Sequence, residues 1–365
     1  MRTFVAIGLT LLGNAGVSLA EPPAIPYQWK LPPGFPRPAV PDSNPMSGAK
    51  VSLGCRLFFD TRLSSTGTHS CATCHRPELA FTDGRSQSPG VTGQLTPRSA
   101  MSLANLAYTP AYTWASDRAV TLEQQMATPL FNTHPLEMGL AGHQDALVHS
   151  LQQNDADASE FRAAFPGDPA PVSMDHVIDA IATFERTLVS GRSAFDRYVF
   201  DDEPTALSPA ARRGMALFFS PRAGCSECHS GLNFSGPIVH HASGAVTGVF
   251  ANTGVSTATS TATNGDRGLI DVSGRAGDLG KFRVPTLRNI ALTAPYMHSG
   301  SIATLPAVID HYVAIGASRA KTEQLDAKLG PLVLDNAARA DLVSFLESLT
   351  DPQFTNVANL PCQRQ

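Results

Sequence analysis

Apolar residues recur with the period of an α-helix in three parts of the chain. Each set repeats every three or four positions, so its members form one face of a helix. The sets are Met174, Val177, Ile178, Ile181, Ala182, Phe184 and Leu188; Val308, Ile309, Tyr312 and Val313; and Leu342, Val343, Phe345 and Leu346. The pattern predicts a helix over each of these segments.

Two other segments have a different character. Residues 22–45 are rich in proline, and residues 243–277 are rich in Gly, Ser, Thr and Ala without any period. Such compositions favour extended or irregular chain. We therefore expect a mainly α-helical fold with long loops and few short strands, and a surface loop over 243–277.

The first twenty residues have the pattern of a secretory signal peptide. Met1 and Arg2 precede an apolar stretch over 4–17, which ends at the small residues Ser18 and Ala20. Gly8, Gly13, Asn14 and Gly16 interrupt the stretch, whereas a membrane anchor needs about 20 unbroken apolar residues. We expect residues 1–20 to be removed, and the mature chain to be periplasmic with no membrane span.

Size and charge narrow the possible functions. The rest of the chain exceeds one ordinary domain, which predicts about two cores. A formal net charge of -4 without a basic run argues against nucleic-acid and membrane-surface partners. Four of the six cysteines lie in two Cys-x-x-Cys-His units, which leaves Cys55 and Cys362. Spacing alone leaves open whether these two form a disulfide or are separate thiols.

The chain contains two copies of one module, roughly 155 residues apart. The first copy has LGCRLFF at 53–59 and CATCH at 71–75, followed by Phe81-Thr82. The second has RGMALFF at 213–219 and CSECH at 225–229, followed by Asn233-Phe234. The repeat predicts an N-terminal domain over 21–200 and a C-terminal domain over 201–365.

The Cys-x-x-Cys-His units predict covalently bound haem c. Two thiols at this spacing can add to the two vinyl groups of one porphyrin, and the following histidine can then bind the iron. The attachment residues would be Cys71 and Cys74 with His75, and Cys225 and Cys228 with His229. A zinc ribbon is the alternative, and two units that each end in His favour haem. The sixth ligand of each iron would then distinguish an electron carrier from an enzyme.

Several further segments resemble the bacterial di-haem cytochrome c peroxidase and MauG superfamily over nearly the whole mature chain. The matching segments are 57–64, 71–75, 80–84, 125–139, 225–230, 281–289 and 294–298.

The resemblance implies an open first haem. No His occurs between His75 and His134, whereas family members that need reductive activation have a capping His in this region. The residues that match the family's distal pocket are Gln125, Pro129 and Glu137, with two residues inserted before Glu137. Glu137 would be the acid and base of peroxide cleavage. Its alternative is a helix N-terminal Glu that interacts favourably with the helix dipole.

For the second haem the resemblance implies a tyrosine ligand. Peroxidases that accept electrons have a Met fourteen residues after the position of His298, and here that position is Tyr312, as in MauG. The alternative for Tyr312 is a core aromatic of an amphipathic helix. Met297 would only pack. Trp114 matches the Trp that lies between the two haems, with simple packing as its alternative.

A calcium ion between the haems is also implied. The family holds it by two main-chain carbonyls, which correspond to Thr293 and Pro295, and by an Asn, in whose place this chain has Ser99.

The function implied by the resemblance is peroxide-driven oxidation of a protein partner. Hydrogen peroxide would generate a high-valent state shared by both haems, which oxidises a partner side chain by long-range electron transfer. Residues 131–143 look most similar to the MbnH branch, in which the reaction converts Trp to kynurenine in the copper-binding protein MbnP. Two alternatives remain: a peroxidase fed by a small cytochrome c or cupredoxin, and a non-enzymatic electron carrier.

Overall fold

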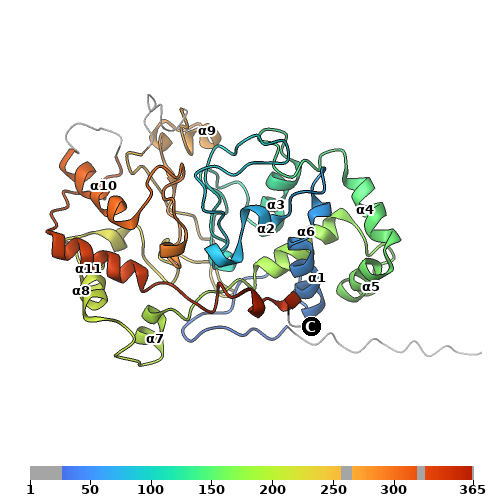
Figure 1. The fold of residues 1–365 in the computed structure, drawn as a ribbon, viewed down its shortest axis with the longest axis horizontal. Helices are drawn as coiled ribbons and strands as arrows, with labels where there is room; N and C mark the ends of the chain where they lie inside the picture. Colours follow the sequence, from blue (N-terminus) through green and yellow to red (C-terminus); the bar gives the residue numbers. More distant parts are fainter. Residues whose placement is uncertain (1–26, 256–264, 319–324, 364–365) are drawn as a thin grey trace, which may run out of the picture.

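The computed structural model describes residues 27–255, 265–318 and 325–363, so the predicted signal peptide lies outside the described residues. Its helices gather in two groups (Figure 1). The first group consists of α1 (Gly48–Phe58), α2 (Cys71–Cys74), α3 (Leu122–Phe131), α4 (Gln144–Gln153), α5 (Asp155–Ala164) and α6 (Met174–Glu185). The second consists of α7 (Ala194–Phe200), α8 (Pro209–Phe218), α9 (Ile270–Ser273), α10 (Leu305–Ser318) and α11 (Asn336–Glu347).

The mainly helical prediction is confirmed. The three periodic segments form α6, α10 and α11, and the described part of the 243–277 loop contains one short strand and α9. That strand, β1 (Phe250–Ala251), pairs antiparallel with β2 (Phe282–Arg283). Among the described residues no helix is both long and apolar enough to cross a bilayer.

Side-chain caps fix where the main helices begin. Ser47 accepts a hydrogen bond from the Lys50 amide at the start of α1, and Ser173 accepts one from the His176 amide at the start of α6. Ser208 caps α8 and Asp335 caps α11 in the same way. Each cap satisfies one amide that the first helical turn leaves without a partner.

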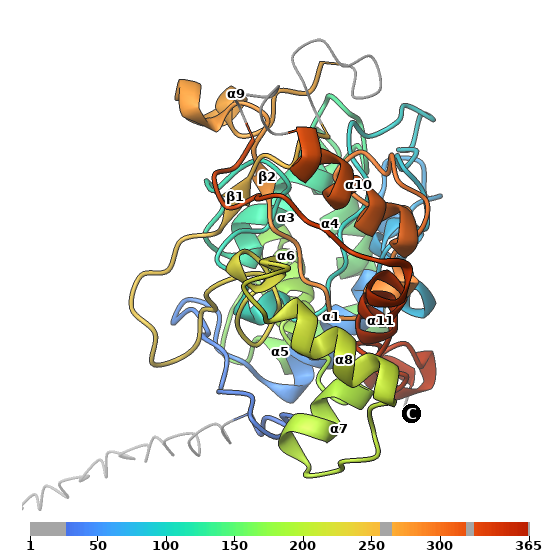
Figure 2. The same ribbon diagram turned by 90° about the vertical axis from the view of Figure 1, so that its left-hand side faces the viewer.

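Two hydrophobic cores follow the order of the chain. The first is built from buried residues between Leu53 and Leu188, and the second from buried residues between Phe195 and Leu349. In the first, α1 packs on α6; in the second, α8 packs on α11 (Figures 1 and 2). The predicted boundary near residue 200 stays a prediction, although the cores divide close to it.

Each helix pair crosses at a glycine. A Cβ atom on Gly54 would lie 1.8 Å from the carbonyl oxygen of Ala180, and one on Gly214 would lie 1.9 Å from that of Asp341. Only a residue without a side chain allows this approach. The crossings give the register of the duplication: Ala180 in α6 corresponds to Asp341 in α11.

The C-terminal tail returns to the first core. Leu360 is buried there, and the Phe354 ring lies 5.3 Å from the Phe81 ring. Cys362 forms a disulfide with Cys55 of α1, which answers the question that the sequence leaves open. The tail follows the second module in sequence but packs on the first, and its end lies beside α1 in Figure 1.

Replacement of Gly54 by Ala tests the helix crossing. The added methyl group would force α1 and α6 apart, and overpacking of this kind costs about 1–3 kcal/mol. Gly48→Ala is the matched control, because nothing lies within 4 Å of the added atom, and its cost should stay within about 0.5 kcal/mol. Denaturant unfolding followed by circular dichroism measures both. Equal stability of the two variants would refute a tight crossing.

Candidate functional site

The first Cys-x-x-Cys-His unit forms a rigid turn. Cys71 and Cys74 begin and end α2, and His75 follows as its C-cap. The His75 Nδ1–H donates to the Phe81 carbonyl at 2.8 Å. This bond leaves Nε2 with a free lone pair and fixes the ring orientation, as is usual for metal-binding histidines. Phe81 has a positive φ of 62°, which a buried non-glycine residue rarely adopts.

The second unit repeats this arrangement. Cys225 lies in a single 3-10 turn, and the His229 Nδ1–H donates to the Phe234 carbonyl at 2.8 Å. Phe234 also has a positive φ, of 51°. Burial lowers the pKa of both His75 and His229, which keeps the rings neutral and able to bind a metal.

Sequence reasoning missed the two carbonyl partners. Phe81 and Phe234 are part of the internal repeat, but a repeated phenylalanine is most simply explained by packing. Their recurrence after each His is the signal that could have revealed them.

A first cavity contains the first unit and the residues expected at its distal side. Its walls include Cys71, Cys74, His75, Gln125, Pro129, Glu137 and Trp114. The empty space within it, mouth included, is about 1320 Å³. The structure therefore brings together the residues that the resemblance assigns to this pocket.

Glu137 reaches this cavity from a loop. Gln125 and Pro129 belong to α3, and Glu137 lies in the segment between α3 and α4. The Val91 amide donates to the Glu137 carbonyl at 3.0 Å, and the Met138 amide donates to the Pro129 carbonyl at 3.0 Å. The alternative of a helix N-terminal Glu is wrong, because no helix begins here. Burial raises the pKa of Glu137.

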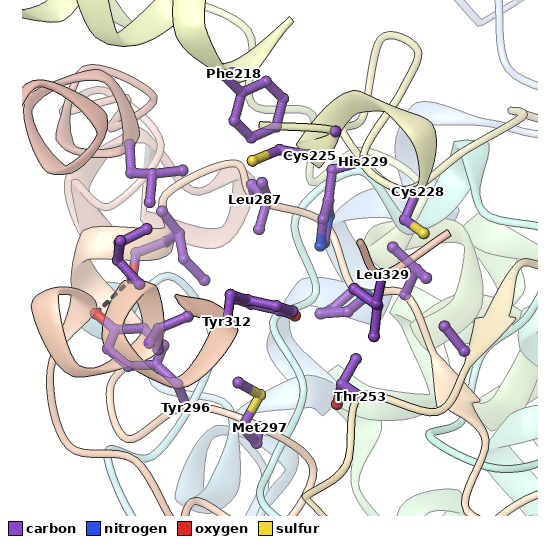
Figure 3. A pocket seen from close by; sticks show the side chains of 18 of the residues that line it. Phe218, Cys225, Cys228, His229, Thr253, Leu287, Tyr296, Met297, Tyr312 and Leu329 are labelled. Atoms are coloured by element: carbon purple, nitrogen blue, oxygen red, sulfur yellow. Dashed lines mark hydrogen bonds between the residues drawn. The ribbon is translucent and has the colours of Figure 1, made fainter. Parts of the chain in front are cut away.

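A second cavity of about 1470 Å³ contains Cys225, Cys228, His229 and Tyr312. Tyr312 extends from α10 into this cavity toward His229, and Met297 lies on the opposite side of Tyr312 from His229 (Figure 3). Burial raises the pKa of Tyr312. Met297 also lines the cavity, so its expected packing role stays a prediction.

Trp114 lines both cavities. Its indole Nε1–H donates to the Ser99 carbonyl at 2.9 Å, and its own carbonyl accepts from the Arg283 amide of β2 at 2.7 Å. Its ring lies 6.5 Å from the His298 ring. These contacts hold the indole between the two attachment units, where the resemblance places it.

The three residues expected to bind calcium share a smaller cavity of about 540 Å³. Ser99, Thr293 and Pro295 line it, together with Arg85 and Arg283. The Ser99 hydroxyl donates to the carbonyl of Met297 at 3.2 Å. The described lining residues include no carboxylate, whereas Ca²⁺ sites usually contain several. The donor set fits calcium poorly, so calcium stays a prediction and carries no step below.

The donor sets of the two larger cavities fit haem c. Each combines two cysteines, a half-buried histidine with an oriented ring and a large, mostly apolar volume. The two cysteine pairs line different cavities, which excludes one zinc ribbon built from both.

Comparisons with known proteins agree with this geometry. Residues 48–204 match the family model described as di-haem cytochrome c peroxidase. The methylamine utilization protein MauG of Methylorubrum extorquens is 35% identical to this chain, over 95% of this chain and 91% of that protein. The chain belongs to the di-haem cytochrome c peroxidase and MauG family. It is therefore a haem-dependent oxidoreductase with two c-type haem domains.

Two further proteins similar to this chain are of different types, one a peroxidase and the other MauG-like. Cytochrome c551 peroxidase of Pseudomonas aeruginosa is 33% identical, over 85% of this chain and 81% of that protein. A solved structure described as a MauG-like protein associated with microbial copper homeostasis is 38% identical, with a TM-score of 0.87 over 93% of this chain and 100% of that one.

Replacement of Tyr312 by Phe tests its expected ligand role. With two haems bound, the resting protein should show one high-spin and one low-spin ferric signal in electron paramagnetic resonance, because the resemblance implies a sixth ligand for the second haem and none for the first. Tyr312→Phe should convert the low-spin signal to high-spin.

Tyr296→Phe is the matched control for this change. Tyr296 lines the same cavity, but its hydroxyl donates to the Ile290 carbonyl at 3.1 Å, so both signals should persist. A low-spin signal that survives Tyr312→Phe would return Tyr312 to a packing role.

Proposed function

We propose that this enzyme reduces hydrogen peroxide at the first cavity and withdraws the two electrons from a side chain of a protein partner. The observation that carries the proposal is Tyr312 in the wall of the second cavity, at the position where the family's electron-fed peroxidases have Met. An anionic oxygen donor disfavours reduced iron, whereas a Met sulfur favours it. A Tyr at this position therefore suits a site that stores oxidising equivalents more than one that collects electrons.

The residues of each cavity have distinct tasks in this proposal. His75 would hold the first haem, His229 and Tyr312 would hold the second, and the bound haems would supply the redox chemistry. Glu137 accepts a proton from one oxygen of peroxide and returns it to the other, which turns the departing oxygen into water. Burial raises its pKa, so this carboxyl group holds a proton more readily than an exposed glutamate does.

Trp114 supplies the connection between the two cavities. Its indole is fixed by hydrogen bonds at both its Nε1–H and its backbone carbonyl, and it lines both spaces. The reaction balances as one peroxide, two protons and two electrons giving two waters. The electrons leave the partner, which is oxidised without entering the first cavity.

The partner is assigned by similarity. A MauG-like protein associated with copper homeostasis shares 38% identity with this chain, which favours a periplasmic copper-handling protein as the substrate. Conversion of a Trp in that protein to kynurenine is the finer prediction. It takes two turnovers, because oxidation of Trp to N-formylkynurenine removes four electrons, and hydrolysis then releases formate to leave kynurenine. The second candidate is a peroxidase fed by a small cytochrome c or cupredoxin, which the 33% identity to cytochrome c551 peroxidase supports.

Glu137→Gln tests the proposed mechanism. The variant should retain both haems, because the Cys-x-x-Cys-His units that attach them are unchanged. It should react with peroxide about 10²-fold more slowly or worse after loss of general acid–base catalysis. Stopped-flow absorbance measures the rate. Glu78→Gln is the control, because Glu78 is exposed and pairs with Arg76 at the surface.

The same samples decide between the two candidate functions. Mass spectrometry of a copper-binding protein encoded by a neighbouring gene should show peroxide-dependent oxidation with the wild type and little with Glu137→Gln. An unmodified partner, together with rapid turnover on a reduced small cytochrome, would favour the peroxidase.

A further inference from the structure

Glu185 is a buried carboxyl group for which the mechanism above has no role. It ends α6, is only 5% exposed and lines the first cavity together with Gln125 and Glu137. Burial of a carboxyl group costs free energy unless the group is paired or hydrogen-bonded. Its retention in the wall of a reaction cavity points to function.

The second module shows that packing does not require a carboxyl group here. Because Ala180 corresponds to Asp341 at the two helix crossings, the position of Glu185 in α6 corresponds to that of Leu346 in α11. Leu346 is 6% exposed and lines the second cavity. The same place in the same fold is thus filled by leucine where no peroxide reacts and by a carboxyl group where it does.

The charged and titratable neighbours of Glu185 come from three helices and a loop. Arg186 is adjacent in sequence, but its guanidinium donates to both carboxylate oxygens of Glu123 in α3, at 2.6 and 2.7 Å. Cys71 of α2 and Tyr112 of the loop before α3 complete the surroundings. The nearest cation is therefore already paired, and burial raises the pKa of Glu185 to about 8.

We propose that Glu185 supplies the two protons that convert the second peroxide oxygen to water, a role that rests on the proposed function. Glu137 only moves a proton from one peroxide oxygen to the other, whereas two further protons are needed to form two waters. As the two electrons arrive, Glu185 passes its proton to the oxygen that remains, regains a proton from solvent at the cavity mouth and passes that one as well. The oxygen then leaves as the second water, and solvent protonates the Glu185 carboxylate again.

The pH dependence of peroxide turnover with ascorbate as the electron donor tests this role in the haem-loaded full chain, because the two protons are needed only when electrons arrive. The protonated acid is the active form, so the wild-type rate should fall as pH rises through about 8. Glu185→Gln keeps the shape of the side chain but removes the carboxyl proton. It should react about 10²-fold more slowly at pH 7, at the lower end of general acid catalysis, and should lack the fall near pH 8.

Two further variants and a spectroscopic signature keep the test decisive. Glu185→Leu installs the residue of the second module and should behave like Glu185→Gln, even if the latter folds poorly. Glu347 is an exposed carboxylate at the C-terminal end of α11, as Glu185 is at the C-terminal end of α6. Glu347→Gln should keep the wild-type rate and pH profile. Infrared difference spectra of the resting protein should show a protonated carboxyl band that disappears in Glu185→Gln.

The outcomes separate this proposal from the proposed function. A wild-type rate and pH profile in both Glu185 variants, or no loss of the infrared band, would overturn the role of Glu185. Peroxide turnover is measured with ascorbate in place of the protein partner. Failure of partner oxidation in a wild type that still reacts with peroxide would therefore count against the proposed function alone.

Discussion

The close crossing of two helices at a glycine is the constraint on which this structure depends, and it occurs twice. At Gly54 and at Gly214 one helix lies directly against a backbone carbonyl of another, which a side chain would prevent. The crossing fixes α1 against α6 and α8 against α11. It also fixes the loop that follows α1 and α8, in which each Cys-x-x-Cys-His unit lies. Two equivalent cavities therefore arise from one helix arrangement, each with a histidine held by a phenylalanine carbonyl.

On this common framework the two cavities differ in their walls. The first has an amide and two carboxyl groups, from Gln125, Glu137 and Glu185, which can hold and move protons. The second has the phenol of Tyr312 among mostly apolar neighbours. Trp114 borders both. The groups that can hold and move protons thus line the cavity of one module, and a candidate iron ligand lines the cavity of the other, although the two share a fold.

The sequence predicts the local features well and the long-range features poorly. The three periodic helices and both haem-attachment units depend on short spacings, which the sequence displays directly. The Cys55–Cys362 disulfide spans a separation of 307 residues, and no local pattern fixes such a pairing. The orientation of the Phe81 and Phe234 carbonyls depends on a left-handed backbone conformation, which a phenylalanine in the sequence does not predict. In the sequence, Glu185 has no feature that separates it from other polar residues near the end of a helix. Its place in the cavity wall is visible only in the structure.

The central claim is that both cavities act as one oxidising unit, connected at Trp114. One equivalent of peroxide added to the haem-loaded resting enzyme, followed by rapid freezing and electron paramagnetic resonance, tests it most directly. The account predicts that the high-spin signal of the first haem and the low-spin signal of the second disappear together and at the same rate. Loss of the high-spin signal alone, with the low-spin signal unchanged, would contradict it.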